Sequence, residues 1–166
     1  MTTDPIELVP GVLAPDFTAV AVGGVYESPE SIHLKSLLGC TVVLYFYPKD
    51  DTPGCTAQAC GLRDRWEKIQ RPDTHFFGVS ADSLSSHRDF IEKFSLPFPL
   101  ISDESHAVAK AYDIWVEKSM YGKTYFGIER STFVIRPDGR IKSIFRKVNP
   151  AEHADLLETH LANFET

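Results

Sequence analysis

The sequence predicts an α/β fold in which a mixed central sheet carries helices on both faces and is extended by an N-terminal β-hairpin. Two β-branched and aromatic runs, 41–47 and 74–80, have the composition of strands buried on both faces of a sheet. The helical segment between them leaves only short connections, which implies a right-handed parallel crossover. The tripeptide Pro137-Asp138-Gly139 joins two later strands as an antiparallel hairpin. Parallel and antiparallel pairs in one sheet make that sheet mixed.

The composition is that of one globular domain, and we expect residues 1–166 to form it without a linker. The chain has 166 residues, of which 43% are hydrophobic and 24% charged, enough to bury a core. The longest apolar run, 42–47, is far below the ~20 residues that span a bilayer. The N-terminus lacks a basic segment followed by an apolar one. We therefore expect a cytoplasmic protein with no membrane partner.

The charge of the chain argues against nucleic acid as a partner. Seventeen Lys and Arg against 23 Asp and Glu give a formal net charge of −6 at pH 7, which is the wrong sign for gathering polyanions. Three cysteines are too few for a disulfide-rich secreted scaffold, and their odd number leaves at least one thiol unpaired. The roles of the three thiols are therefore the main question that the sequence poses.

The first 40 residues are the least regular part of the chain. The pair Gly23-Gly24 separates the segments 16–20 and 25–27, which predicts a small hairpin. Residues 31–38 suggest a short helix closed by Gly39. Both elements precede the first buried strand.

The first buried strand ends at Pro48 and leads, through a short polar loop, into a helix. Thr52 is followed by Pro53, which is the pattern of a helix N-cap with proline at the first helical position. We expect this helix to continue to about Gln70, before the second buried strand at 74–80. The junction between the first strand and this helix holds the most informative stretch of the sequence.

The second half of the chain completes the predicted order. Its expected elements are helices at 83–94, at 104–112 and from Asn149 to Leu161, and strands at 98–102, 131–136 and 141–147. Together these make a parallel βαβ half, a helical connection and a ββα half. That order is similar to the order of the thioredoxin fold, so we expect a thioredoxin-like architecture, although a fold by itself does not determine a function.

Cys55 lies in the first turn of the predicted helix. With Thr52 as N-cap, Cys55 is the third helical residue, and its sulfur is close to backbone N–H groups that have no partner within the helix. Those groups stabilise an anion, so the position suits a reactive thiolate. We expect Thr52 to accept from the Cys55 N–H, and Gly54 to let a substrate approach the backbone. The spacing alone is equally compatible with a small buried cysteine behind a good helix cap.

Cys60 follows five residues later in the same predicted helix. In an ideal helix the two Cα atoms are about 8.7 Å apart and on different faces, whereas a disulfide needs roughly 4.4 to 6.8 Å. A bond between Cys55 and Cys60 therefore requires the first turns to unwind, while the two free thiols are compatible with an intact helix. This is the geometry of a switch between two states. The alternative is that Cys60 is an inert core thiol that faces the sheet.

The residues around the two cysteines resemble a known family. The spacing Pro48-x3-Thr52-x2-Cys55 matches the peroxiredoxin active-site pattern. The longer string FYPKDDTPGCTAQACGLRD resembles the peroxiredoxin Q branch, also called bacterioferritin comigratory protein. Downstream, LISD at 100–103, EKSMYGKTYFGIERSTFVI at 117–135 and the PDGRI turn agree with the same branch. The resemblance covers nearly the whole chain.

The resemblance implies a thioredoxin-dependent peroxidase that uses no cofactor and no metal. Its expected substrates are hydrogen peroxide and organic hydroperoxides, consumed in antioxidant defence, and its expected partner is thioredoxin or a similar dithiol. Cys55 matches the peroxidatic cysteine, which becomes a sulfenic acid. Cys60 matches the resolving cysteine of one subset of the branch, which forms a transient disulfide with Cys55. Because one chain contains both cysteines, we expect that a monomer completes the cycle.

Three further site residues are assigned by the same resemblance. Pro48 and Thr52 match the residues that shield and orient the thiol. Arg130 matches the arginine that holds the thiolate and the peroxide, a task that suits a permanently charged guanidinium. Taken alone, however, the sequence favours a surface ion pair between Arg130 and Glu129. Cys40 has no counterpart in the pattern, and we expect it to be a small core residue.

Other chemistries find less support in the sequence. The three cysteines and six histidines show no CxxC or HExxH spacing, so we expect neither a metal site nor a disulfide oxidoreductase. We expect His153 and His160 on a solvated helix face. Four aromatic residues are expected either to line the thiol pocket or to join the core: Trp115, Tyr121, Tyr125 and Phe126. A thiol redox sensor is the main alternative to a peroxidase, and catalytic turnover distinguishes the two.

Overall fold

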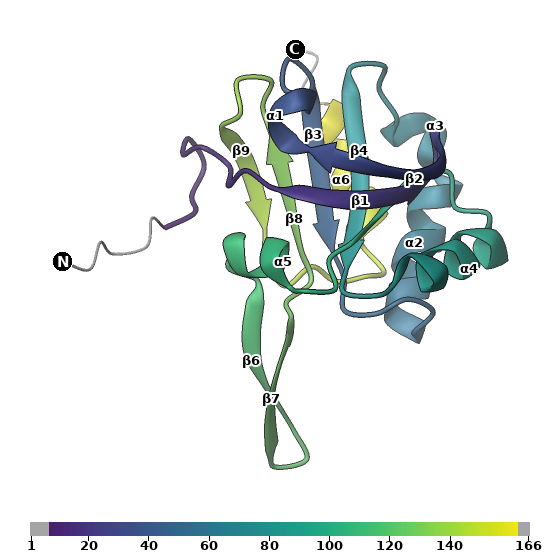
Figure 1. The fold of residues 1–166 in the computed structure, drawn as a ribbon, viewed down its shortest axis with the longest axis vertical. Coiled ribbons are helices and arrows are strands. Elements are labelled where there is room, and N and C mark those ends of the chain that lie inside the picture. Colours follow the sequence, from purple (N-terminus) through teal and green to yellow (C-terminus); the bar gives the residue numbers. More distant parts are fainter. Residues whose placement is uncertain (1–6, 163–166) are drawn as a thin grey trace.

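The computed structural model describes residues 7–162, and its centre is a seven-stranded mixed sheet (Figure 1). The strand order across the sheet is β2-β1-β5-β4-β3-β8-β9. Its strands are β1 (Thr18–Gly23), β2 (Tyr26–His33), β3 (Thr41–Phe46), β4 (Thr74–Ser80), β5 (Leu100–Ser102), β8 (Ser131–Ile135) and β9 (Ile141–Phe145). A separate two-stranded ribbon consists of β6 (Trp115–Met120) and β7 (Lys123–Ile128).

Both kinds of strand pairing that the sequence predicts are present in the large sheet. β3 runs parallel to β4 and β4 parallel to β5, whereas β8 is antiparallel to β3 and to β9. The helices are α1 (Leu34–Leu37), α2 (Pro53–Asp64), α3 (Trp66–Ile69), α4 (Leu84–Phe94), α5 (Ala107–Ala111) and α6 (His153–Ala162). In the described part of the chain, no helix combines the length and the apolar character needed to cross a membrane.

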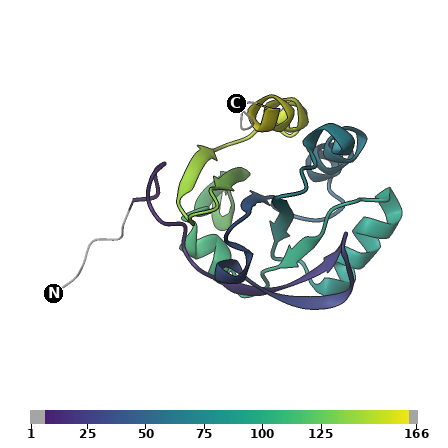
Figure 2. The same ribbon diagram turned by 90° about the horizontal axis from the view of Figure 1, so that it is seen from above.

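Two hydrophobic cores, one on each face of the sheet, follow from the alternation of side chains along β3. Leu44 and Phe46 belong to one core, and Val43 and Tyr45 to the other. Residues of α1 and α5 complete the first core, and residues of α2, α3, α4 and α6 complete the second. Figure 2 shows α2 and α6 side by side. Because β3 is buried on both faces, the loop that follows it starts from a rigid position.

Two predicted helices begin later than expected. Residues 31–33 pair with β1 as the end of β2, so the helix predicted over 31–38 is reduced to α1. The C-terminal helix begins at His153 rather than at Asn149, whose side-chain oxygen accepts from the Ala151 N–H in the preceding turn. In both cases, residues that the sequence pattern assigned to the helix belong instead to the neighbouring strand or turn.

The helix predicted from Thr52 to Gln70 is interrupted at Arg65, which separates α2 from α3. After the break, Trp66 packs edge to face on Phe76, with ring centroids 5.2 Å apart. This packing partly buries a large aromatic side chain against the second core. The interruption is therefore a tertiary effect that helix propensity does not contain.

The ribbon of β6 and β7 is absent from the sequence prediction and extends away from the main body (Figure 1). Its turn residues, Tyr121 and Gly122, have φ angles of 54° and 77°, as a two-residue hairpin turn requires. Tyr121 is 97% exposed and Phe126 is 58% exposed, so the expectation that they join the core is wrong. A ribbon whose side chains are mostly exposed or half-buried lacks the alternation of polar and apolar residues by which a strand is predicted.

Candidate active site

Cys55 lies just after β3, in the first turn of α2. Thr52 has the extended backbone of an N-cap, with φ −95° and ψ 155°, and Pro53 opens the helix. Cys55 is the third helical residue and is 2% exposed. Its position at a helix N-terminus is therefore the predicted one, and the sulfur is sheltered from water among amides that favour an anion.

Arg130 approaches Cys55 from the segment between β7 and β8. Its Nη1 donates to the Cys55 Sγ over 3.4 Å and to the Gln58 Oε1 over 2.5 Å. The backbone at Arg130 is fixed, because the Val148 N–H donates to its carbonyl oxygen over 2.8 Å. A permanently charged guanidinium at this distance stabilises the thiolate form of the sulfur.

Glu129, the alternative partner of Arg130, has partners of its own. It accepts from the Ser131 Oγ over 3.1 Å and lies 3.6 Å from the Arg146 Nη1. The prediction of a surface ion pair between Glu129 and Arg130 is therefore wrong. Neighbouring residues of an extended segment point to opposite sides, so Arg130 turns toward the thiol and Glu129 away from it.

A chain of buried polar side chains continues from Arg130 to α6. Gln58 is 1% exposed, and because its Oε1 accepts from Arg130, its Nε2 donates to the His153 Nδ1 over 3.0 Å. The His153 Nε2 then carries the ring proton and donates to the Thr132 Oγ1 over 2.8 Å. Every member of this chain has the partner that burial requires.

His153 is neutral within this series of hydrogen-bonded side chains, because burial lowers its pKa to about 3 and Arg130 adds to the effect. The expectation of a solvated position is wrong for His153, since α6 packs against α2 and turns this side chain inward. His160 is half-buried, with its Nε2 3.1 Å from the Ser143 Oγ. Burial and Lys142 lower the pKa of His160.

Three residues of this site do not follow from the motif around Cys55: Gln58, Thr132 and His153. Gln58 carried a signal, because it follows Cys55 by three residues and therefore shares a helix face with it. His153 and Thr132 carried none, since both are far from Cys55 in sequence and are brought to it by α6 and β8.

Thr52 and Gly54 contact other groups than expected. The Thr52 Oγ1 donates to the Lys49 carbonyl oxygen over 2.9 Å instead of capping the helix, which stabilises the loop before α2. A Cβ added at Gly54 would be 3.2 Å from the Arg130 Nη2, so the glycine leaves room for the guanidinium. Pro48 is half-buried at the start of the same loop.

Cys60 lies further along α2, and both thiols are free. Since α2 is continuous from Pro53 to Asp64, it holds the two cysteines apart, as predicted for the dithiol. Cys60 is half-buried rather than enclosed in the core. Cys40 is half-buried too, so its predicted place in the core is wrong, because it precedes β3 in the turn after α1.

Lys118 of β6 brings a second positive charge to the site. Its Nζ donates to the Ile128 carbonyl oxygen over 2.5 Å. Its aliphatic carbons cross Gly127, where an added Cβ would be 3.3 Å from the Lys118 Cδ. Burial and the charge of Arg130 lower the pKa of Lys118, whereas Cys55 raises it. The ammonium group therefore interacts electrostatically with both residues of the thiol site.

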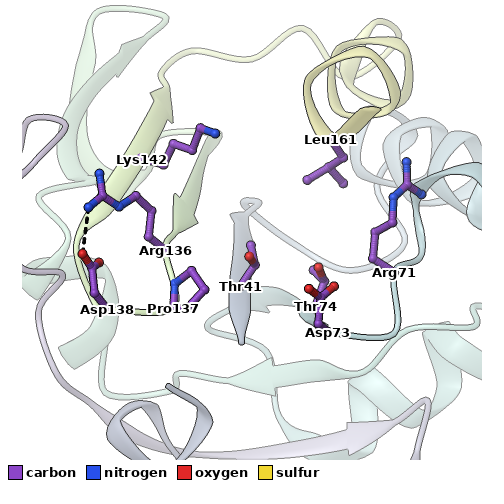
Figure 3. Close-up of a pocket in the computed structure, with 9 residues that line it drawn as sticks. All are labelled: Thr41, Arg71, Asp73, Thr74, Arg136, Pro137, Asp138, Lys142 and Leu161. Carbon is purple, nitrogen blue, oxygen red and sulfur yellow. Dashed lines mark hydrogen bonds and ion pairs between the residues drawn. The ribbon is translucent and has the colours of Figure 1, made fainter. Parts of the chain in front are cut away.

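A cavity of about 510 Å³ lies at the other end of β3 and is lined by no cysteine (Figure 3). Thr41 and Thr74, the first residues of β3 and β4, contribute to its wall, and the ion pair of Arg136 with Asp138 lies at one side. Because Cys55 follows the opposite end of β3, the length of the strand separates it from this cavity. The cavity is therefore not the site of thiol chemistry.

One group of side chains in residues 7–162 has the composition and spacing to be considered for a metal ion. One ligand atom from each of Asp50, Asp82 and His87 lies within 4.8 Å of the others. These atoms already form hydrogen bonds, among them a contact of 2.7 Å between the His87 Nδ1 and the Asp50 Oδ2. A metal ion would have to replace the proton in that contact.

Comparisons with known proteins agree on one family. The model of the AhpC/TSA family matches residues 10–144. Peroxiredoxin Bcp of Bacillus subtilis is 47% identical over 131 residues, which cover 78% of this chain and 83% of that protein. Peroxiredoxin Bcp of Escherichia coli is 40% identical over 147 residues, which cover 89% of this chain and 91% of that protein.

Solved structures show the same fold. A bacterioferritin comigratory protein from Xanthomonas campestris, solved in work on its alkyl peroxide reduction activity, matches with a TM-score of 0.80 at 37% identity, covering 90% of this chain and 92% of that one. A mutant of PrxQ from Xylella fastidiosa matches with a TM-score of 0.81 at 30% identity, covering 100% and 99%. The predicted thioredoxin-like fold with an N-terminal strand pair is thereby confirmed.

Proposed function

This chain belongs to the AhpC/TSA family and is a peroxidase of its peroxiredoxin Bcp branch, and we propose that Cys55 is the residue that reduces the peroxide. The observation that carries the proposal is the contact of the Arg130 Nη1 with the Cys55 Sγ at the N-terminus of α2. The guanidinium and the first-turn amides both favour the thiolate, which is the nucleophilic form of cysteine.

The proposed substrates are hydrogen peroxide and organic hydroperoxides. The study of alkyl peroxide reduction in the X. campestris relative supports the organic class. In the first step the Cys55 thiolate attacks one peroxide oxygen, the O–O bond breaks, and that oxygen stays on the sulfur as a sulfenic acid. The other oxygen takes a proton and leaves as water or an alcohol. Arg130 stabilises the negative charge that moves from sulfur to the leaving oxygen.

Cys60 is the proposed resolving residue. Its thiolate attacks the Cys55 sulfur, an S–S bond forms, and the sulfenic oxygen leaves as water. Because α2 holds the cysteines apart, the helix unwinds before this step. Pro48 and Thr52 take the roles of shielding the thiol and orienting the loop that leads to it, which the loop position of both residues supports.

The proposed reductant is a thioredoxin-type dithiol, which donates two electrons to the disulfide and restores both thiols. The three cysteines are free, which suits a reducing compartment, and we assign the protein to the cytoplasm and to antioxidant defence. Since one chain contains both reacting cysteines, residues 1–166 are proposed to work as a single-domain monomer. None of the proposed steps requires electrons or atoms from a cofactor.

Peroxide consumption with a thioredoxin system tests this function in the wild type and in Cys55→Ser, Cys60→Ser and Cys40→Ser. We expect no turnover from Cys55→Ser, a single oxidation without recycling from Cys60→Ser, and wild-type turnover from Cys40→Ser. Wild-type turnover by Cys55→Ser would overturn the assignment of Cys55. Normal recycling of Cys60→Ser would remove Cys60 as the resolving residue. Oxidation of the wild type by one equivalent without turnover would favour a redox sensor.

A further inference from the structure

A buried carboxyl group, Asp50, and a buried imidazole, His87, anchor the loop between β3 and α2 to the interior of the protein. The thiol chemistry described above does not use them. Asp50 lies in this loop, five residues before Cys55, and its side chain is 3% exposed. His87 comes from α4, and its side chain is 0% exposed. The Asp50 Oδ2 and the His87 Nδ1 are 2.7 Å apart. Two segments that are far apart in sequence are thus joined inside the protein next to the thiol site.

The partners of His87 determine where its protons lie. The His87 Nε2 is 2.9 Å from the Ile101 carbonyl oxygen, which only accepts, so Nε2 carries a proton. The Nδ1 faces a carboxylate oxygen of Asp50 at hydrogen-bond distance, which requires a second proton between the two atoms. In a neutral imidazole only one ring nitrogen carries a proton. This second proton belongs to His87 if the Asp50 carboxyl group is ionised, and to Asp50 if the imidazole is neutral.

The other contacts of Asp50 satisfy its carboxylate in the ionised form. The Tyr47 Oη donates to Oδ1 over 2.5 Å, and the Ser86 Oγ donates to Oδ2 over 2.8 Å. Burial raises the pKa of Tyr47 well above its usual value, with Tyr45 and Asp50 adding to the effect, so the Tyr47 hydroxyl keeps the proton that it donates. With His87, three side chains donate to this one carboxylate. A buried carboxylate with three donors is stabilised in its ionised form, because these hydrogen bonds replace those that water would make.

The backbone of the loop is held at the same place. The Asp50 N–H donates to the Asp82 Oδ2 over 2.8 Å, and the Ser80 Oγ donates to the same oxygen over 2.6 Å. Asp51, the next residue, behaves differently: it is exposed and forms a surface ion pair of 2.8 Å with Lys93. The chain thus provides two adjacent carboxylates, one anchoring the loop inside and one at the surface.

We propose that His87 is protonated on both ring nitrogens and that its pair with Asp50 positions the loop from which Thr52 and Cys55 depart. The kinetic part of this inference rests on the proposed role of Cys55. Asp50 and His87 are positioning residues that act through the loop. A shift of a nucleophile by about 1 Å costs on the order of 10²-fold in rate, so a loosened loop slows the reaction with peroxide.

The first test is the ¹⁵N NMR spectrum of the His87 ring in the reduced protein. We expect both ring nitrogens of the wild type to give the signals of protonated nitrogen. In Asp50→Asn the amide donates to the ring, so one His87 nitrogen is expected to lose its proton. An unprotonated His87 nitrogen in the wild type would overturn the proposal. A shift of the wild-type signals on adding Zn²⁺ would also overturn it, because a metal ion and not a proton would then occupy the site.

The second test is the rate at which Cys55 is oxidised by hydrogen peroxide, measured by stopped flow. We expect Asp50→Ala and His87→Ala to slow this step by at least about tenfold. Asp50→Asn keeps a hydrogen bond to the neutral ring and is expected to recover most of the rate. Asp51→Asn removes the same charge from the same loop and is expected to stay within about twofold of the wild type.

Circular dichroism shows whether each variant is folded. If His87→Ala is not folded, His87→Gln replaces it, because the glutamine amide keeps one donor toward Asp50. A folded Asp50→Ala and a folded His87 variant that both react like Asp51→Asn would overturn the positioning role. If the wild type itself fails to react with peroxide, the proposed function fails, while the ring spectrum still decides the protonation of His87.

Discussion

Arg130 and Gln58 share a hydrogen bond of 2.5 Å, so the guanidinium beside Cys55 is held by a side chain of the same helix that carries Cys55. Gln58 lies between Cys55 and Cys60 in the sequence. Unwinding of α2 over this stretch breaks the bond to Arg130 and the bond from Gln58 to His153. The position of Arg130 is thereby coupled to the helical state of α2.

We expect Gln58→Ala to speed disulfide formation and to slow the oxidation of Cys55, each by several-fold. The helix loses a hydrogen bond of about 1 kcal/mol to His153 and one of about 1.5 to 3 kcal/mol to the charged guanidinium, so it unwinds more easily, and Arg130 loses its anchor. Stopped-flow fluorescence and rapid-quench mass spectrometry separate the two steps. Gln70→Ala, at an exposed glutamine after α3, is the matched control. If Gln58→Ala matches this control in both steps, Gln58 does not couple Arg130 to the helix.

Replacing Arg130 with Met is expected to slow the oxidation of Cys55 by about 10²-fold, because the charge next to the sulfur and the leaving oxygen is lost. The rate of Arg130→Lys is expected to fall between those of Arg130→Met and the wild type, since lysine keeps the charge but not the planar guanidinium whose Nη1 contacts both Cys55 and Gln58. Arg146→Met removes a surface arginine that pairs with Glu129 and serves as control. A rate for Arg130→Met equal to that of the control would argue against an electrostatic role.

Lys118→Met is expected to slow the oxidation of Cys55 by a few-fold, because a second cation that interacts with the thiol is removed. Lys123→Met, at an exposed lysine of the same ribbon, is the control. Gly127→Ala should mimic the effect by displacing the Lys118 side chain. Equal rates for the Lys118 and Lys123 variants would refute this prediction.

The protein is expected to lose stability as the pH falls from about 6.5 toward 3, because of His153. In the folded state burial lowers the pKa of His153 to about 3, whereas the unfolded chain takes up the proton near 6.5. Below pH 6.5 the unfolded state therefore binds more protons and is favoured, by up to about 4 to 5 kcal/mol at pH 3. Urea unfolding at several pH values measures this loss. His153→Gln should reduce the pH dependence, and an unchanged dependence would contradict the assignment.

The central sheet was predictable because the residues of each buried strand themselves indicate that it is buried. β3 and β4 are buried on both faces along most of their length, so apolar residues stand side by side in their sequences instead of alternating with polar ones. The ribbon of β6 and β7 was not predictable, because most of its side chains are exposed or half-buried and show no regular alternation of buried and exposed positions. Only the pair Tyr121-Gly122 indicated a turn there.

The candidate site likewise has features that the sequence predicted and features that it did not. The place of Cys55 at the start of α2 depends on the adjacent residues Thr52 and Pro53, and the structure agrees with it. The hydrogen bond of Thr52 was predicted wrongly, because its hydroxyl reaches a carbonyl of its own loop instead of the helix. The catalytic roles of Cys55 and Cys60 stay predictions that the variants above test.

The sequence by itself determined that Cys55 lies in the first turn of a helix and that a regular helix separates it from Cys60, because both follow from the geometry of one helix. Only the tertiary structure decided that Arg130 turns to Cys55, that Gln58 and His153 meet, and that Asp50 pairs with His87. These contacts join residues 75, 95 and 37 positions apart in the chain. Their partners are selected by the packing of α2, α4 and α6 around the sheet, which no local pattern of residues records.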